Sequence, residues 1–163
     1  MNFPHVDIAN EVFTQTVRWI HDATNVIIDI NGYFTAPGAS GGLAFYPVTP
    51  CRIADTRNPT GPFGGPSLGA GGSRGFTVRQ SACNIPATEQ AYSFNLTVVP
   101  SAQLFYLSTW PAGQPLPVVS TLNDLQGQVL ADAAIVPAGS SGGISVYVSD
   151  PANVIIDVNG YFQ

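Results

Sequence analysis

The chain has 163 residues, of which 45% are apolar, so it is long enough to bury a substantial hydrophobic core. Only 9% are charged, the five cations are all Arg, and the formal net charge is −5. Because no basic cluster exists, we expect neither nucleic-acid binding nor attachment to an anionic membrane surface. No apolar run is long enough for a membrane-spanning helix, and the first residues do not resemble a signal peptide. We therefore expect that a leader has been removed or that the chain is a piece of a longer one.

The first element in the chain repeats the last one. Residues 25–34 read NVIIDINGYF and residues 153–162 read NVIIDVNGYF, so nine of the ten positions are identical. The likeness continues upstream, where TVRWIHDAT aligns with ISVYVSDPA, and HVDIANEVF aligns more weakly with VLADAAIVP. We therefore interpret residues 1–34 as a partial repeat, which holds the last two or three strands of a module whose front is missing.

The rest of the chain has the pattern of a complete all-β module. Residues 35–42 (TAPGASGG) predict a linker, and residues 43–163 predict the module itself. Apolar and polar residues alternate with a period of two, and helix signals are almost absent. Short strands separated by turns predict an antiparallel β-sandwich, with a jelly-roll-like arrangement as the alternative. The predicted strands are 43–48, 51–57, 74–79, 91–100, 104–110, 117–123, 128–137, 143–150 and 153–162.

The partial repeat needs a host, because three strands alone cannot bury an apolar face. It could add strands to its own module or complete a neighbouring copy by β-augmentation, and the pattern does not distinguish the two. Docking on neighbouring copies would produce a ring or a filament. The residues expected to pack against the host are Phe13, Val17, Trp19, Val26, Ile28, Ile30, Tyr33 and Phe34.

The two cysteines, Cys51 and Cys83, are not spaced for a zinc site. In a Lys-free chain rich in Ser, Thr and Gly, we predict that they form a disulfide in a secreted protein, with two buried free thiols as the alternative. Such a bridge would stabilise the surroundings of residues 58–75, which are too rich in Gly and Pro to hold their own conformation.

Seven motifs follow one another along the module. They are FYPVTPCRIADTR (45–57), GPFGGP (61–66), SACNIPA (81–87), SFNLTVVP (93–100), YLSTWPAGQPLPVVSTLN (106–123), AAIVPAG (133–139) and NVIIDVNGYF (153–162). This series resembles a repeat module found in large secreted and cell-surface bacterial proteins, and the resemblance covers essentially all of residues 43–162. It implies an extracellular β-rich module that builds surfaces or appendages, often in tandem copies, with no catalytic residues to transfer.

Catalytic and metal chemistry find little support in the sequence. The module has no His, since His5 and His21 both lie in the partial repeat, so a Ser–His–Asp or Cys–His arrangement within the module is excluded. Its carboxylates are scattered over strands and turns, and no metal-ligand spacing is present. We therefore expect a protein that is not an enzyme and that uses no metal or cofactor.

Two groups of side chains remain as candidate sites. Asp55 and Arg57 are two residues apart on one strand, and we predict an ion pair between Arg57 and Asp157, with a ligand-binding Arg as the alternative. Tyr106 and Trp110 share a strand face and could form a sugar-stacking platform, unless a neighbouring strand or subunit covers them.

The sequence therefore predicts a structural extracellular module that assembles with copies of itself by strand docking. Such a module would serve as the subunit of a filament, a surface layer or a tandem-repeat stalk. The alternative is a glycan-binding adhesion module that holds a surface polysaccharide on the Tyr106/Trp110 face.

Overall fold

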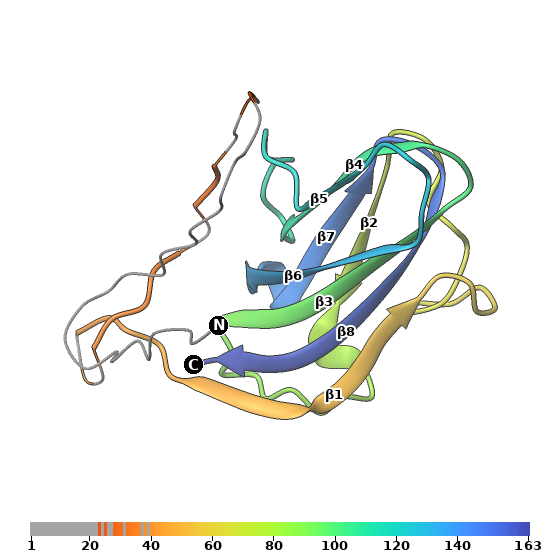
Figure 1. Ribbon diagram of the computed structural model, residues 1–163. Helices are drawn as coiled ribbons and strands as arrows, with labels where there is room; N and C mark the ends of the chain where they lie inside the picture. Colours follow the sequence, from red (N-terminus) through yellow and green to blue (C-terminus); the bar gives the residue numbers. More distant parts are fainter. Residues whose placement is uncertain (1–22, 24, 26–27, 31, 37, 39) are drawn as a thin grey trace, which may run out of the picture. The chain divides into compact units, whose positions relative to one another are not determined.

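Eight strands of the computed structural model form two antiparallel four-stranded sheets, which confirms the predicted all-β sandwich (Figure 1). The structure describes residues 23, 25, 28–30, 32–36, 38 and 40–163. Sheet 1 has the order β1 (Phe45–Asp55), β8 (Ala152–Phe162), β3 (Ala91–Pro100), β6 (Leu130–Pro137). Sheet 2 has the order β2 (Gly72–Thr77), β7 (Gly143–Val148), β4 (Leu104–Pro111), β5 (Leu122–Asp124). Two short 3₁₀ turns, η1 (Val78–Gln80) and η2 (Ser140–Gly142), complete the regular structure of the described residues.

The pairing of the strands defines the topology. The first strand pairs with the last, β2 pairs with β7, β3 with β6, and β4 with β5. This is the pattern of one long antiparallel hairpin that has rolled up, and the β3–β8 and β4–β7 contacts then close the two sheets. The module is therefore a jelly roll, which was the alternative arrangement expected from the sequence.

The core lies between the sheets and follows from the period-two pattern. In β3, the side chains of Tyr92, Phe94, Leu96 and Val98 are fully buried, whereas the intervening Ser93, Asn95 and Thr97 are half-buried on the outer face. Strands β7 and β8 contribute further fully buried residues to the same core, and Phe76, Leu104 and Leu107 fill it from the other strands. Each such side chain stabilises the fold by about 1.5–3 kcal/mol through removal of apolar surface from water.

Most predicted strands are present, with two differences. The predicted strands 43–48 and 51–57 are one continuous strand, β1, and the predicted strand 117–123 is reduced to β5. Residues 112–121 instead form a loop along β4, held by the Thr121 amide, which donates to the Leu107 carbonyl at 2.8 Å. This loop contains Pro115 and Pro117, which have no N–H to give to a sheet ladder.

The predicted disulfide is confirmed. Cys51 in β1 is bonded to Cys83 in the loop between β2 and β3, and the two Cα atoms are 5.7 Å apart. The bridge therefore ties the edge strand of sheet 1 to a long connection that has little regular structure of its own.

The chain divides into two units, Met1–Leu43 and Ala44–Gln163. The described residues of the first unit belong to no strand, and the predicted strands at 5–13 and 16–24 lie outside the described residues, except for position 23. All eight strands belong to the second unit.

Candidate functional site

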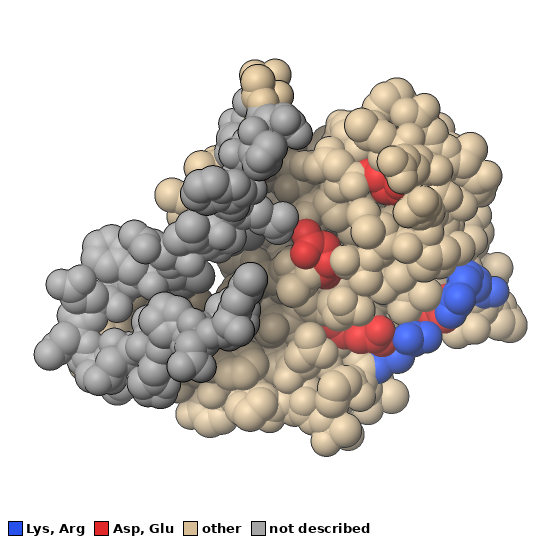
Figure 2. Space-filling view, in the orientation of Figure 1, with Lys and Arg blue, Asp and Glu red and all other residues tan. Residues whose placement is uncertain are grey.

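A row of four charged side chains, Arg52, Asp55, Arg57 and Asp157, lies on the outer face of sheet 1, where β1 and the residues just after it run beside β8. Arg52 of β1 stands directly opposite Asp157 of β8 in the strand register. Figure 2 shows basic and acidic side chains alternating along one side of the molecule, in the region where Figure 1 places β1. Three of the four salt bridges among the described residues belong to this row, and the fourth joins Arg79 to the buried Glu89.

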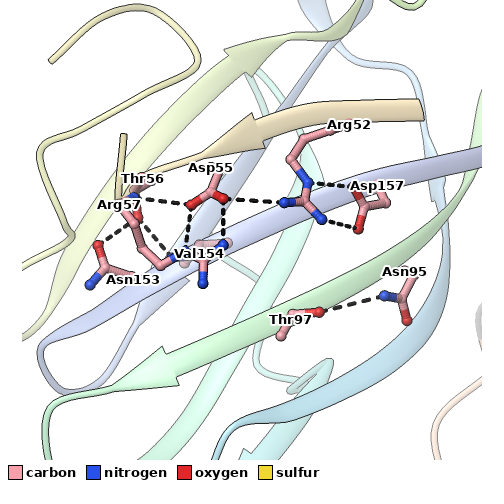
Figure 3. Close-up of polar contacts among 9 residues, drawn as sticks. All are labelled: Arg52, Asp55, Thr56, Arg57, Asn95, Thr97, Asn153, Val154 and Asp157. Carbon is pink, nitrogen blue, oxygen red and sulfur yellow. Dashed lines mark hydrogen bonds and ion pairs between the residues drawn. The ribbon is translucent and has the colours of Figure 1, made fainter. Parts of the chain in front are cut away.

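Arg52 connects the two strands (Figure 3). Its Nε donates to Asp157 Oδ1 at 2.8 Å and its Nη2 donates to Asp157 Oδ2 at 3.2 Å, so the pair is bidentate. Its Nη1 also donates to Asp55 Oδ2 at 3.2 Å. The hydrogen bond that Arg52 donates to the Asp157 carboxylate is the main cause that raises the pKa of Arg52.

Asp55 is the buried centre of the row. Its side chain is 5% exposed, and it accepts hydrogen bonds from Arg57 Nε at 2.8 Å, from Arg57 Nη2 at 2.6 Å and from the Arg57 amide at 3.1 Å. These bonds, above all those from the guanidinium, outweigh the cost of burial and lower the pKa of Asp55 to about 2. The carboxylate is therefore fully ionised at neutral pH.

The end of β1 is tied to β8 by a hydroxyl. Thr56 Oγ1 donates to Asn153 Oδ1 at 3.0 Å and accepts from the Val154 amide at 2.8 Å. The Thr56 amide in turn donates to the Val154 carbonyl at 3.0 Å, so the chain beyond β1 continues to pair with β8. Thr56 is buried, and its polar groups are satisfied by β8.

A shallow polar hollow lies next to the charged row. Its lining residues are Pro50, Arg52, Asn95, Asp157 and Asn159. Asn95 makes only a long contact in this region, 3.5 Å from its Nδ2 to Thr97 Oγ1 (Figure 3). The hollow contains no nucleophile paired with a base, and its two charged residues neutralise each other, so its geometry supports no acid–base chemistry.

The ion pair predicted between Arg57 and Asp157 is replaced by two others. Arg57 binds Asp55, and Asp157 binds Arg52, a residue that the sequence reasoning did not select. Strict alternation would place Arg52 and Asp55 on opposite faces of β1. The strand register shifts between Arg52 and Ala54, and this irregularity brings both onto the outer face.

The predicted aromatic platform is not open to solvent. Trp110 lies on the outer face of sheet 2, opposite Ser145 in the register, but it is only 8% exposed, and its Nε1 donates to the Gln114 carbonyl at 2.8 Å. The loop 112–121 covers it. Tyr106 is half-buried, and its ring centroid is 5.4 Å from that of Tyr147.

The predicted docking residues are partly described. Phe13, Val17, Trp19 and Val26 lie outside the described residues. The other four are highly exposed in the isolated chain: Ile28 (82%), Ile30 (87%), Tyr33 (81%) and Phe34 (59%). Large apolar side chains so exposed and so close in sequence form an apolar stretch of the described surface.

The β8 copy of the same sequence packs its aromatic residues against β1. The Tyr161 ring is stacked on the Tyr46 ring at 5.4 Å, and the Phe162 ring lies 5.0 Å from the Phe45 ring. Strand β1 also leaves no room for a side chain at Gly160 of β8. An added Cβ would overlap the Phe45 ring and would lie 2.8 Å from the Tyr46 carbonyl oxygen. Together with the bonds of Asp157 and Asn153 described above, these contacts mean that β1 and the following residue, Thr56, contact five side-chain positions of β8.

Within the described residues, no group of three or more His, Cys, Asp or Glu side chains is placed to hold a metal ion. No helix among the described residues is long and apolar enough to cross a membrane. Comparison with protein-family models, with curated proteins and with solved structures found no match to this chain.

Proposed function

We propose that this protein is a structural extracellular module that assembles with copies of itself by docking of its N-terminal segment as a strand. The observation that carries the proposal is that residues 25–34 keep all five of the β8 residues that β1 and Thr56 contact. Their equivalents in the segment are Asn25, Asp29, Gly32, Tyr33 and Phe34.

The exposure of the segment adds to this argument. In β8, Ile156 and Val158 are fully buried, whereas their equivalents Ile28 and Ile30 are more than four-fifths exposed. Burying two such side chains would stabilise a complex by about 3–6 kcal/mol before the costs of ordering and association are subtracted. An apolar strand with this composition is retained in water only at the risk of non-specific aggregation, so a dedicated host is expected.

The extracellular setting is supported by the Cys51–Cys83 disulfide, since such bonds persist in oxidising compartments. The glycan-binding alternative receives no such support, because the loop 112–121 covers Trp110. Self-assembly is therefore the function that the described residues support best.

The test compares the whole chain with the variant Ile28→Asp/Ile30→Asp by multi-angle light scattering and negative-stain electron microscopy. We expect concentration-dependent rings or fibres for the wild type and monomers for the variant. The matched control is Ile135→Asp, which places the same charge on a partly exposed apolar residue of the outer strand β6. A wild type that stays monomeric up to high concentration, or a loss of assembly only in the β6 variant, contradicts the proposal.

A further inference from the structure

We propose that the position of β8, between β1 and β3, also accepts residues 25–34 of a second copy, so that the two segments are interchangeable occupants of one site. The inference rests on the proposed function and extends it by naming the host strands and the segment that is replaced. The host surface is formed by β1 (Phe45–Asp55) and β3 (Ala91–Pro100).

The glycines give the most specific argument. Gly160 has no room for a side chain because β1 crowds it, but an added Cβ at Gly32 meets nothing within 4 Å in the isolated chain. Neither residue has the positive φ angle that would call for glycine. Glycine at position 32 therefore has no explanation in the isolated segment, and it fits a strand that lies against the Phe45 ring and the Tyr46 backbone.

The polar and aromatic residues of the segment are also identical to the β8 residues that contact β1. Asp157 receives two hydrogen bonds from Arg52, and Asp29 would present the same carboxylate at the same position. Tyr33 and Phe34 would stack on Tyr46 and Phe45 as Tyr161 and Phe162 do. The only difference within the ten residues, Ile30 for Val158, adds one methylene group to a buried position.

This site is a better host than an open sheet edge. A strand between β1 and β3 forms two hydrogen-bond ladders and directs one face into the core, whereas a strand added beside β6 forms one ladder. The occupant must displace β8. Since the two segments are nearly identical, the contact free energies almost cancel, and occupancy depends on concentration.

The experiment uses full-length chains. The recipient carries an affinity tag and the substitutions Gly160→Val and Gly32→Val, so that neither of its segments fits between β1 and β3. It is refolded from urea together with an untagged donor, which is either the wild type or the control variant Gly32→Val. The control donor keeps an intact β8, so any complex formed through β8 appears with both donors.

We expect the wild-type donor to form a two-chain complex, detected by affinity capture and light scattering, and the control donor to form about tenfold less. A milder recipient, Gly160→Ala/Gly32→Ala, repeats the comparison in case the valine variant does not fold in any form. Equal capture of the two donors would overturn the inference. So would monomeric folding of the single variant Gly160→Val, because its own segment would then fill the site.

These outcomes separate the inference from the proposed function. If the wild type assembles in the microscope but the complex does not depend on Gly32, the assembly is supported and this host site is wrong. If the Gly32-dependent complex forms but the wild type alone stays monomeric, the host site is supported and self-assembly fails.

Discussion

At the scale of the residue, Asp55 should control how the fold responds to acid. The pKa of this carboxylate falls from its ordinary value of 3.8 to about 2, chiefly through its hydrogen bonds with Arg57. A lowered pKa means that the folded state binds the proton less tightly than the unfolded chain. The stabilisation is therefore complete above pH 4 and is lost as the pH falls through about 2.

We expect the free energy of unfolding of the wild type to fall by roughly 2 kcal/mol more than that of Asp55→Asn between these pH values. Urea unfolding followed by circular dichroism at several pH values measures the difference. Asp132→Asn is the control, because Asp132 is an exposed carboxylate on β6. If the Asp55 and Asp132 variants give the same pH dependence, the buried position of Asp55 in the ion-pair row is not significant for stability.

The ion pairs of this row are only partly predictable from the sequence. The presence of ion pairs around Asp55, Arg57 and Asp157 was foreseen from residue types alone, because charges on half-buried strands require partners. The partners themselves depend on the shift between Arg52 and Ala54, which reverses the side on which Arg52 emerges. No local pattern announces such an irregularity, because it is set by the pairing with a strand about one hundred residues away in the chain.

At the scale of the element, Arg74 organises the Gly- and Pro-rich loop between β1 and β2. Its Nη1 donates to the Gly64 carbonyl at 2.6 Å and its Nη2 donates to the Gly61 carbonyl at 2.5 Å, with longer bonds to the carbonyls of Pro62 and Pro66. The guanidinium carbon lies 4.9 Å from the centre of the Phe76 ring. One side chain therefore holds a loop that has few ladder bonds of its own.

We expect Arg74→Met, which keeps the apolar stem but removes the donors, to lower the free energy of unfolding by about 2–4 kcal/mol. The loop should also become sensitive to limited proteolysis. Arg74→Lys should recover little of this, since a single ammonium cannot reproduce the planar arrangement of donors. A lysine variant as stable as the wild type would show that the charge matters and the geometry does not.

The disulfide stabilises the module by joining β1 to the connection between β2 and β3. Cys51 and Cys83 are 32 residues apart in the sequence, and a loop of this length predicts that the bond stabilises the fold by about 3–4 kcal/mol through restriction of the unfolded chain. The variant Cys51→Ser/Cys83→Ser should lose that amount in urea unfolding. Addition of a reducing agent to the wild type should have the same effect, whereas the variant should not respond to it.

Some elements were predictable and others were not, for physical reasons. β3 was predicted with its observed bounds, because both of its faces have a defined environment and the alternation is complete. Residues 117–121 have strand-like composition but belong to a loop, in which Ser108 of β4 donates to the Val119 carbonyl and the Thr121 amide donates to the Leu107 carbonyl. Composition records the apolar character of such a segment but not whether it covers a sheet or extends it.

At the scale of the whole molecule, the jelly-roll topology makes the completion of sheet 1 depend on β8, which pairs with both β1 and β3. β1 and β8 are neighbours in sheet 1 although they stand at opposite ends of the module. Contacts between segments so distant in sequence form slowly, because loop-closure entropy must be overcome before they contribute. During folding, the surface between β1 and β3 is therefore open before β8 arrives.

This order of events predicts that assembly depends on how the protein was folded. Refolding from urea at high protein concentration should give more oligomer than concentrating the native monomer to the same level, because the segment 25–34 of another copy competes with β8 more readily while the site is open. Size-exclusion chromatography after refolding at two concentrations differing about tenfold measures the effect, since the exchange is bimolecular and the closure by β8 is not. Gly32→Val should remove the concentration dependence without altering the melting temperature of the monomer, because a Cβ added at Gly32 meets nothing within 4 Å. An oligomer fraction that is equal by both routes would mean that native copies associate through surfaces that are already exposed, and β6 would then be the strand to examine.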